Sequence, residues 1–214
     1  MKEKIKISID LMGGDNAPDK TISGINLFLK RNKNINDCFF YLFGDEDIVK
    51  KKIEDSNYLN DNYKLIDTKI IVTNELSALS ALKKGKGSSM WESISSQNSI
   101  NADVTLSAGN TGVLLVMSKM ILKTMEGIGK PALAGLWPSN DGSNIVLDLG
   151  ANVECNDKNL VDFSEMGSAL HKSLFPEKKA KVALLNIGSE ELKGTETLKN
   201  AYTKLKILDG LGDF

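Results

Sequence analysis

The sequence is poor in the residues that carry most metal and redox chemistry. Among its 214 residues are only two cysteines and one histidine. Cys38 and Cys155 lie far apart and neither belongs to a CxxC pair, so a zinc ribbon or a redox dithiol is unsupported. His171 alone excludes a His-rich metal site, and no acid–base partner for it is recognisable. We therefore expect no bound metal, interpret His171 and Cys155 as inert, and expect a reducing compartment.

Arginine, long apolar runs and net charge are scarce as well. Arg31 is the only arginine, so a phosphate site must use lysine, asparagine or backbone N–H groups. No apolar run approaches the roughly 18 residues of a membrane-spanning helix, and charges interrupt residues 1–11, which excludes a signal peptide. The formal net charge is −1, which gives no general attraction to nucleic acid. These absences predict a soluble intracellular protein that binds no nucleic acid.

What is present is the composition of an ordinary globular protein. Hydrophobic residues make up 41% and charged residues 26%, which excludes a disordered or fibrous chain. Short apolar runs alternate with longer amphipathic stretches, and this pattern favours a mostly parallel sheet covered by helices on both faces. We predict an α/β fold, a three-layer α/β/α sandwich, as a single domain over residues 1–214.

The expected elements alternate along the chain. Strands are expected at 4–10, 38–43, 63–72, 104–107 (short and buried), 133–137, 144–149 and 181–187. Helices are expected after Pro18 (with Ile22, Ile25, Phe28 and Leu29 as its apolar positions), after Gly44-Asp45 to about Asp55, and at 76–82, 88–99, 113–125, 159–175 and 195–208.

Polar, glycine-bearing loops follow four of the expected strands, at 10–18, 107–112, 148–153 and 186–194. Open parallel sheets bind their ligands beyond the carboxyl ends of the strands, so we expect these loops to converge on one site. The loop at 107–112 opens a helix, whose first N–H groups and dipole favour an anion. A helix cap with a tight turn is the alternative. Neither the P-loop spacing nor G-x-G-x-x-G occurs.

Several of the polar residues have a functional and a plainly structural interpretation. Asp10, at the end of a strand, either caps neighbouring N–H groups or takes part in acid–base chemistry. Lys193, three residues after Glu190, forms a surface ion pair or contacts a phosphate. Residues 83–86 hold a basic patch, Lys83, Lys84 and Lys86, which is either a solvated face or a docking surface for an acidic macromolecule.

Taken in order, these segments resemble the bacterial phosphate acyltransferases, which convert acyl-[acyl-carrier protein] and phosphate into acyl phosphate for phospholipid synthesis. The matching stretches are 10–18, 44–45, 83–84, 88–90, 107–112, 130–134, 148–153, 166–167, 184–188, Glu190 and 193–194. The family pattern continues past Phe214 with an Asp-Gly-Phe-x-Gly-Asn motif and dimerising helices, so we expect a C-terminally truncated chain. The patch lysines stand where arginine is commoner in the family.

The resemblance implies a fold similar to phosphotransacetylases and the isocitrate/isopropylmalate dehydrogenases, here without the final strands and helices. It also implies a cytoplasmic homodimer, sometimes peripheral at the membrane, that uses acyl-[acyl-carrier protein] and inorganic phosphate without a cofactor. Two other functions stay open: a short-chain phosphotransacetylase that uses acyl-CoA, and a non-catalytic fragment that binds carrier protein. A nicotinamide dehydrogenase has only fold analogy in its favour.

The resemblance leads to a hypothesis for each site residue. Phosphate and substrate contacts are assigned to Asn16, Ser107, Gly109, Asn110, Thr111 and Gly112. Lys193, Asn152, Asn186 and Asp10 form the catalytic group: Lys193 and Asn152 stabilise charge, Asn186 positions them, and Asp10 with Asn16 orders the first loop. The basic patch meets the acidic carrier protein.

Overall fold

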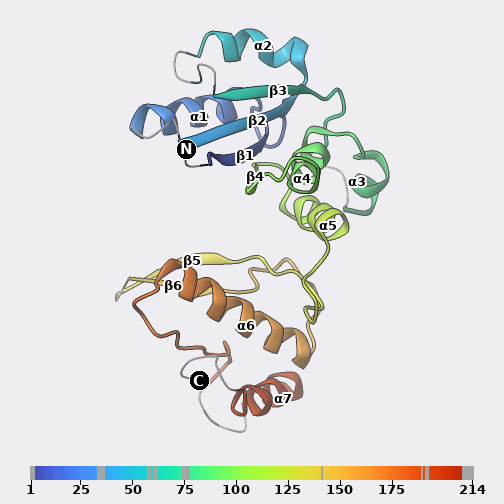
Figure 1. Cartoon of the computed structure of the whole chain (residues 1–214). Helices are drawn as coiled ribbons and strands as arrows, with labels where there is room; N and C mark the ends of the chain where they lie inside the picture. Colours follow the sequence, from blue (N-terminus) through green and yellow to red (C-terminus); the bar gives the residue numbers. More distant parts are fainter. Residues whose placement is uncertain are drawn as a thin grey trace. The chain divides into compact units, whose positions relative to one another are not determined.

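The computed structural model describes residues 3–32, 37–56, 59, 62–73, 78–140, 142–188, 190 and 193–208. The chain divides into two compact units, Met1–Lys123 and Thr124–Phe214, here called unit 1 and unit 2. Figure 1 labels the elements of both units. The single domain expected over residues 1–214 stays a prediction.

Unit 1 is built on a parallel four-stranded sheet in the order β3-β2-β1-β4. The strands are β1 (Ile5–Asp10), β2 (Cys38–Gly44), β3 (Tyr63–Asp67) and β4 (Val104–Ser107). Because β2 lies on one side of β1 and β4 on the other, the order of strands reverses between β1 and β4. This is the topological switch point at which open α/β sheets bind ligands.

Helices lie on both faces of this sheet. Helices α1 (Asp19–Arg31) and α2 (Glu46–Glu54) pack on one face and α4 (Ser89–Ser99) on the other. Helix α5 (Thr111–Leu122) packs against α4, and α3 (Ala78–Lys84) packs against α5. Successive side chains of a strand point to opposite faces. Ile9 accordingly packs in one core with residues of α1 and α2, whereas the hydroxyl of Ser8 bonds that of Ser96 on α4.

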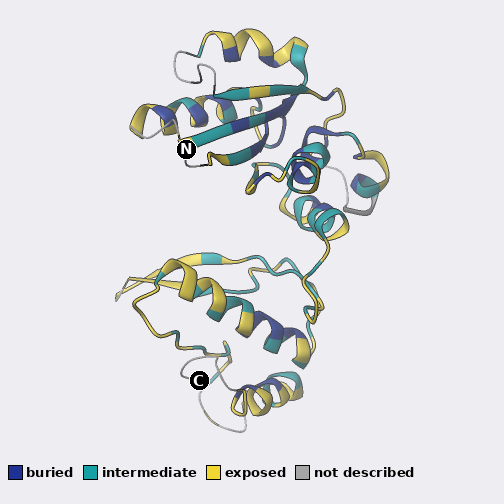
Figure 2. Ribbon diagram, in the orientation of Figure 1, coloured by how far each residue is buried: buried dark blue, intermediate teal, exposed yellow. Residues whose placement is uncertain are grey.

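Helix α1 is amphipathic, and its buried residues lie on the side that packs into this core (Figure 2). Ile22, Ile25 and Leu29 are buried, as the spacing predicts. Phe28 is 44% exposed and does not belong to the core, although its ring meets that of Phe40 edge to face. It falls at the border of the apolar stripe.

Strand β4 forms where expected, but it is not buried. Val104 and Leu106 are 38% and 50% exposed, while Thr105 between them bonds the Ser93 carbonyl of α4. As the last strand in the order, β4 has a neighbouring strand of unit 1 on one side only. The strand expected at 63–72 ends at Asp67, and Ile70 makes only an isolated bridge to Ser88.

Unit 2 contains an antiparallel hairpin, β5 (Gly135–Ser139) and β6 (Gly142–Val146), with α6 (Asp157–Leu174) and α7 (Glu196–Leu205). Helix α6 packs against β6 and α7. The strand expected at 181–187 is wrong: residues 182–187 lie outside every strand, and Leu185 and Ile187 are more than four-fifths exposed. A strand needs a partner for its ladder of hydrogen bonds, which an apolar pattern does not supply.

Two of the four loops therefore do not follow a strand of a parallel sheet. The loop at 148–153 comes after a strand of a hairpin, and the loop at 186–194 comes after an irregular segment. The loops after β1 and β4, in contrast, leave neighbouring parallel strands and so lie at one edge of the sheet.

Candidate anion-binding site

Asp10 and Ser107 join the loops that leave β1 and β4. The Asp10 side chain is buried, with 1% of the residue exposed. Its Oδ1 accepts the Met12 N–H at 3.1 Å, and its Oδ2 accepts the Ser107 hydroxyl at 2.7 Å. The Ser107 oxygen in turn accepts the Gly109 N–H at 3.1 Å. Hydrogen bonds thus run from Gly109 through Ser107 to Asp10 and connect the two loops across the switch point.

Glycines let these two loops touch backbone to backbone. A Cβ on Gly13 would lie 2.4 Å from Oδ2 of Asp10 and 2.9 Å from the Gly109 nitrogen. Gly14 adopts φ +94°, and a Cβ there would lie 2.5 Å from the Ala108 carbonyl oxygen. Side chains at Gly13 and Gly14 would push the loops apart, so the two glycines keep both close to the start of α5.

The loop after β4 ends as the N-terminus of α5. Asn110 caps this helix, because its Oδ1 accepts the Val113 N–H at 3.1 Å. The N–H groups of Thr111 and Gly112, in the first turn, have no carbonyl partner within the helix, and both residues are exposed. Two outward N–H groups, the Thr111 hydroxyl and the positive end of the helix dipole together suit a small anion.

Asn16 lies at the other end of the first loop. It adopts the left-handed φ of +58°, which asparagine tolerates better than most residues. Its backbone carbonyl accepts the Lys20 N–H at 3.2 Å, so Asn16 helps to begin α1. Its side chain is exposed.

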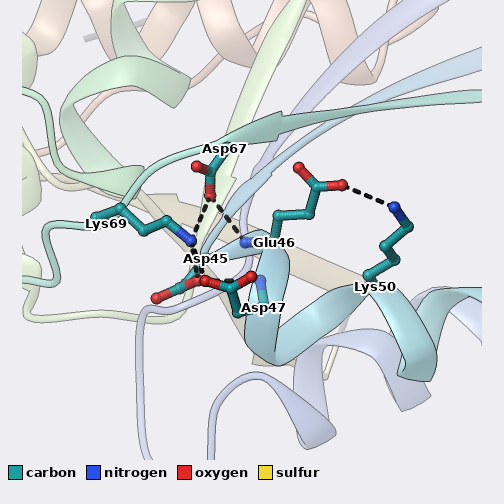
Figure 3. Close-up of polar contacts among 6 residues, drawn as sticks. All are labelled: Asp45, Glu46, Asp47, Lys50, Asp67 and Lys69. Carbon is teal, nitrogen blue, oxygen red and sulfur yellow. Dashed lines mark hydrogen bonds and ion pairs between the residues drawn. The ribbon is translucent and has the colours of Figure 1, made fainter.

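Lys69 joins the loop after β2 to the end of β3 through ion pairs, which Figure 3 shows. Lys69 Nζ lies 2.6 Å from an Asp45 oxygen, 2.7 Å from one of Asp47 and 3.3 Å from one of Asp67. Hydrogen bonds to Asp45 and Asp47 keep the pKa of Lys69 well above its usual value. The pKa of Asp67 is lowered chiefly by the hydrogen bond from the Glu46 N–H, and Lys69 lowers it further.

Sequence reasoning missed this cluster, because its contacts join α2 to the segment after β3. The only local signal was Asp45 and Asp47 at the start of an expected helix, where acidic residues are common. The cluster holds the loop after β2, which is the strand next to β1. Within it, the Asp45 carboxylate contacts Lys69 and accepts the Asp47 N–H.

In unit 2, the Asp148 carboxylate organises the loop at 148–152. Its oxygens accept N–H groups of Leu133 at 2.8 Å, Ala151 at 3.3 Å and Asn152 at 2.7 Å. Partial burial acts to raise the pKa of Asp148, but the bonds from Leu133 and Asn152 outweigh it and lower the pKa. The Asn152 amide donates to Asp148 at 2.9 Å and to the Pro131 carbonyl at 2.8 Å. Both of its amide hydrogens are thereby engaged within unit 2.

Asn186 and Lys193 lie in one turn of unit 2. The Asn186 side chain accepts the Ile187 N–H at 2.8 Å and donates to the Lys193 carbonyl at 3.3 Å. The Lys193 N–H donates to the Glu190 carbonyl at 2.9 Å. Residues 189, 191 and 192 of this loop lie outside the described residues. The structure thus brings the Asn186 side chain to the backbone of Lys193 and separately joins Asp148 to Asn152.

The basic patch lies between two helices. Lys83 and Lys84 end α3, Lys86 lies in the following turn, and all three are exposed. Ser88 then caps α4, since its hydroxyl accepts the Trp91 N–H at 3.2 Å. The turn presents its ammonium groups to solvent, as either interpretation of the patch requires.

The described residues also bear on metal binding and on membrane insertion. Across these ranges, no cluster of three or more His, Cys, Asp or Glu side chains is placed to hold a metal ion. Within the same residues, no helix combines the length and apolar character needed to cross a membrane.

His171 lies on α6 with its ring 5.2 Å from that of Phe175.

Comparison with known proteins identifies the family. The sequence model of a family described as "fatty acid synthesis protein" matches residues 5–212. The chain belongs to this family. Phosphate acyltransferase from Pelagibacter ubique (strain HTCC1062) is 52% identical over 209 residues, which are 96% of this chain and 60% of the relative. Phosphate acyltransferase from Sinorhizobium medicae (strain WSM419) is 41% identical over 206 residues, 96% of this chain and 58% of the relative. The chain spans about 60% of the length of these curated relatives.

A solved structure supports the fold of this member of the fatty acid synthesis protein family. EutD phosphotransacetylase from Staphylococcus aureus matches with a TM-score of 0.65 at 16% sequence identity, over 95% of this chain and 65% of that one. The α/β fold, a mostly parallel sheet with helices on both sides, is confirmed.

Proposed function

We propose that this chain carries the site of an enzyme that transfers an acyl group from a thioester to inorganic phosphate, giving acyl phosphate. The observation that carries the proposal is the glycine-lined N-terminus of α5 at the switch point, in a chain whose relatives are named phosphate acyltransferases. Inorganic phosphate is the small anion that such a reaction requires there.

The reaction asks for positioning and charge stabilisation rather than for a covalent intermediate. A phosphate oxygen attacks the thioester carbonyl carbon, an oxyanion forms, and the C–S bond breaks to release the thiolate, which takes up a proton. The enzyme must hold phosphate within attack distance and stabilise the oxyanion. We assign phosphate to the N–H groups of Thr111 and Gly112 and to the Thr111 hydroxyl, with Asn110 fixing the first turn.

The residues of unit 2 have their own parts in this proposal. Lys193 supplies positive charge for the developing oxyanion, and Asn186 shapes the turn that presents it. Since both amide hydrogens of Asn152 are engaged, we assign Asn152 to holding the loop at 148–152 rather than to contacting an anion.

Acyl-[acyl-carrier protein] is the thioester donor that we propose. The exposed lysines of the basic patch, on a chain of net charge −1, give an acidic carrier protein a local surface to meet. A homodimer in the cytoplasm, with peripheral membrane association, remains part of the same proposal. Acyl-CoA is the alternative donor, and it has no need of a protein-docking surface.

The direct test offers the protein inorganic phosphate and either thioester donor, and traps acyl phosphate with hydroxylamine. We expect product from the acyl-carrier thioester at lower donor concentration than from acyl-CoA. Equal use of both donors would favour the short-chain phosphotransacetylase. Binding of the carrier protein without product would support the non-catalytic fragment and contradict the proposed reaction.

A further inference from the structure

We propose that Asp10 and Ser107 are positioning residues that set the phosphate loop through the Gly109 amide, and that Ser107 does not itself bind phosphate. This rests on the proposed function, in which phosphate binds at the N-terminus of α5. It departs from the expectation that Ser107 and Gly109 contact the anion.

The direction of the hydrogen bonds carries the argument. An ionised carboxylate only accepts hydrogen bonds, so the bond of 2.7 Å to Asp10 uses the single proton of the Ser107 hydroxyl. The Ser107 oxygen faces Gly109 with a lone pair, because it accepts the N–H there at 3.1 Å. Neither Ser107 nor the Gly109 amide then has a hydrogen left to donate to a phosphate oxygen.

The position of Asp10 excludes direct contact with an anion. The side chain is enclosed: the residue is 1% exposed, and the Gly13 backbone lies against Oδ2 so closely that a Cβ would come within 2.4 Å. A buried carboxylate is tolerated when its oxygens are hydrogen-bonded, and both oxygens of Asp10 are. Asp10 thus acts through Ser107 and Gly109 on the backbone that leads into Thr111.

This arrangement makes the effects of the two residues depend on each other. Ser107→Ala removes the hydroxyl in the middle of this series of hydrogen bonds. Asp10→Asn changes the last group of the series while keeping the size of the side chain. Ser107→Ala frees the Gly109 amide, whereas Asp10→Asn turns one of the two acceptor oxygens into an NH2 donor and so disturbs the bond to Met12 or to Ser107. Both changes should loosen the first turn of α5. We expect each to raise the KM for phosphate by about fivefold or more, and the double variant to be no worse than the more damaging single one.

Two further variants separate positioning from a general loss of structure. Ser107→Thr keeps the hydroxyl and should restore the KM for phosphate. Ser164→Ala is the matched control, because it removes a buried hydroxyl that donates to the Leu160 carbonyl at 2.8 Å on α6. It should leave the KM for phosphate unchanged. The KM for the thioester should change little in any of these variants.

The experiment measures acyl-phosphate kinetics, calorimetric binding of inorganic phosphate alone, and hydrogen exchange of the Gly109 amide by NMR. Multiplicative effects of Ser107→Ala and Asp10→Asn on KM would overturn the inference, since independent phosphate contacts behave that way. If the wild-type protein neither makes acyl phosphate nor binds phosphate, the proposed function fails by itself. The exchange data still decide in that case: loss of Gly109 protection in Ser107→Ala, restored in Ser107→Thr, supports the chain of bonds, and unchanged protection refutes it.

Discussion

At the scale of single residues, Asp148 shows how one carboxylate can organise a loop. Three backbone N–H groups and a side-chain amide point at its two oxygens. The folded state lowers its pKa, so the stabilisation is present above the unfolded value of roughly 3.9 and is lost as the pH falls through the lower, folded value. The loop at 148–152 should therefore loosen in acid.

Asp148→Asn tests this role. Replacing an oxygen that accepts several N–H groups should lower the free energy of unfolding by about 1–3 kcal/mol at neutral pH. The variant should also lose less stability than the wild type below about pH 4, because its side chain no longer titrates. Urea unfolding at neutral pH and in acid measures both effects. Glu165→Gln, at an exposed position on α6, is the control. Equal acid sensitivity of Asp148→Asn and the wild type would contradict the assignment.

In the proposed reaction, the positive charge of Lys193 stabilises the developing oxyanion. Lys193→Met should reduce kcat by about a hundredfold or more, as losing a donor to a developing oxyanion does. Lys199→Met is the matched control: this half-buried lysine of α7 pairs with Glu196, and its loss should keep wild-type activity. Acyl-phosphate formation by Lys193→Met at the wild-type rate would remove Lys193 from the mechanism.

At the scale of elements, sequence patterns predicted what is local and failed where partners are distant. Strands β1, β2 and β4 and the capped start of α5 were predicted, because their apolar runs and turn residues adjoin in the chain. The segment at 181–187 reads like a strand, yet it lacks a ladder within the described residues. The bonds from Lys69 to Asp45 and from Leu133 to Asp148 were not predictable, since no spacing rule connects those positions.

The loop after β1 gives a prediction at this scale. Gly13→Ala should lower stability by roughly 1–3 kcal/mol and raise the KM for phosphate, because its Cβ would collide with the Asp10 carboxylate and the Gly109 backbone. Gly24→Ala is the matched control: it lies on α1 with open space around a Cβ, and should raise stability by about 0.5–1 kcal/mol. Thermal unfolding and phosphate kinetics of both variants check this. A silent Gly13→Ala would show that the two loops do not need their close contact.

At the scale of the whole molecule, a nearly neutral chain carries a local basic surface. Changing Lys83, Lys84 and Lys86 together to Glu should raise the KM for the carrier protein severalfold and weaken its salt dependence. The KM for phosphate should not change. The same triple change at Lys50, Lys51 and Lys52 on α2 alters net charge equally and should leave carrier kinetics as they are. Matching effects of both triple variants would assign the result to net charge and not to docking at the patch.

The proposed reaction depends most on phosphate binding to the N–H groups that begin α5. Thr111→Pro removes one of these donors and the hydroxyl, yet proline suits the first position of a helix, and Asn110 before it has a ψ of 120°, outside the helical region that a following proline disfavours. Glu196→Pro makes the same change at the start of α7, whose cap Thr195 is extended. Calorimetric titration with inorganic phosphate should show binding by the wild type and by Glu196→Pro, and its loss in folded Thr111→Pro. Phosphate binding by Thr111→Pro as tight as that of the wild type would contradict the account.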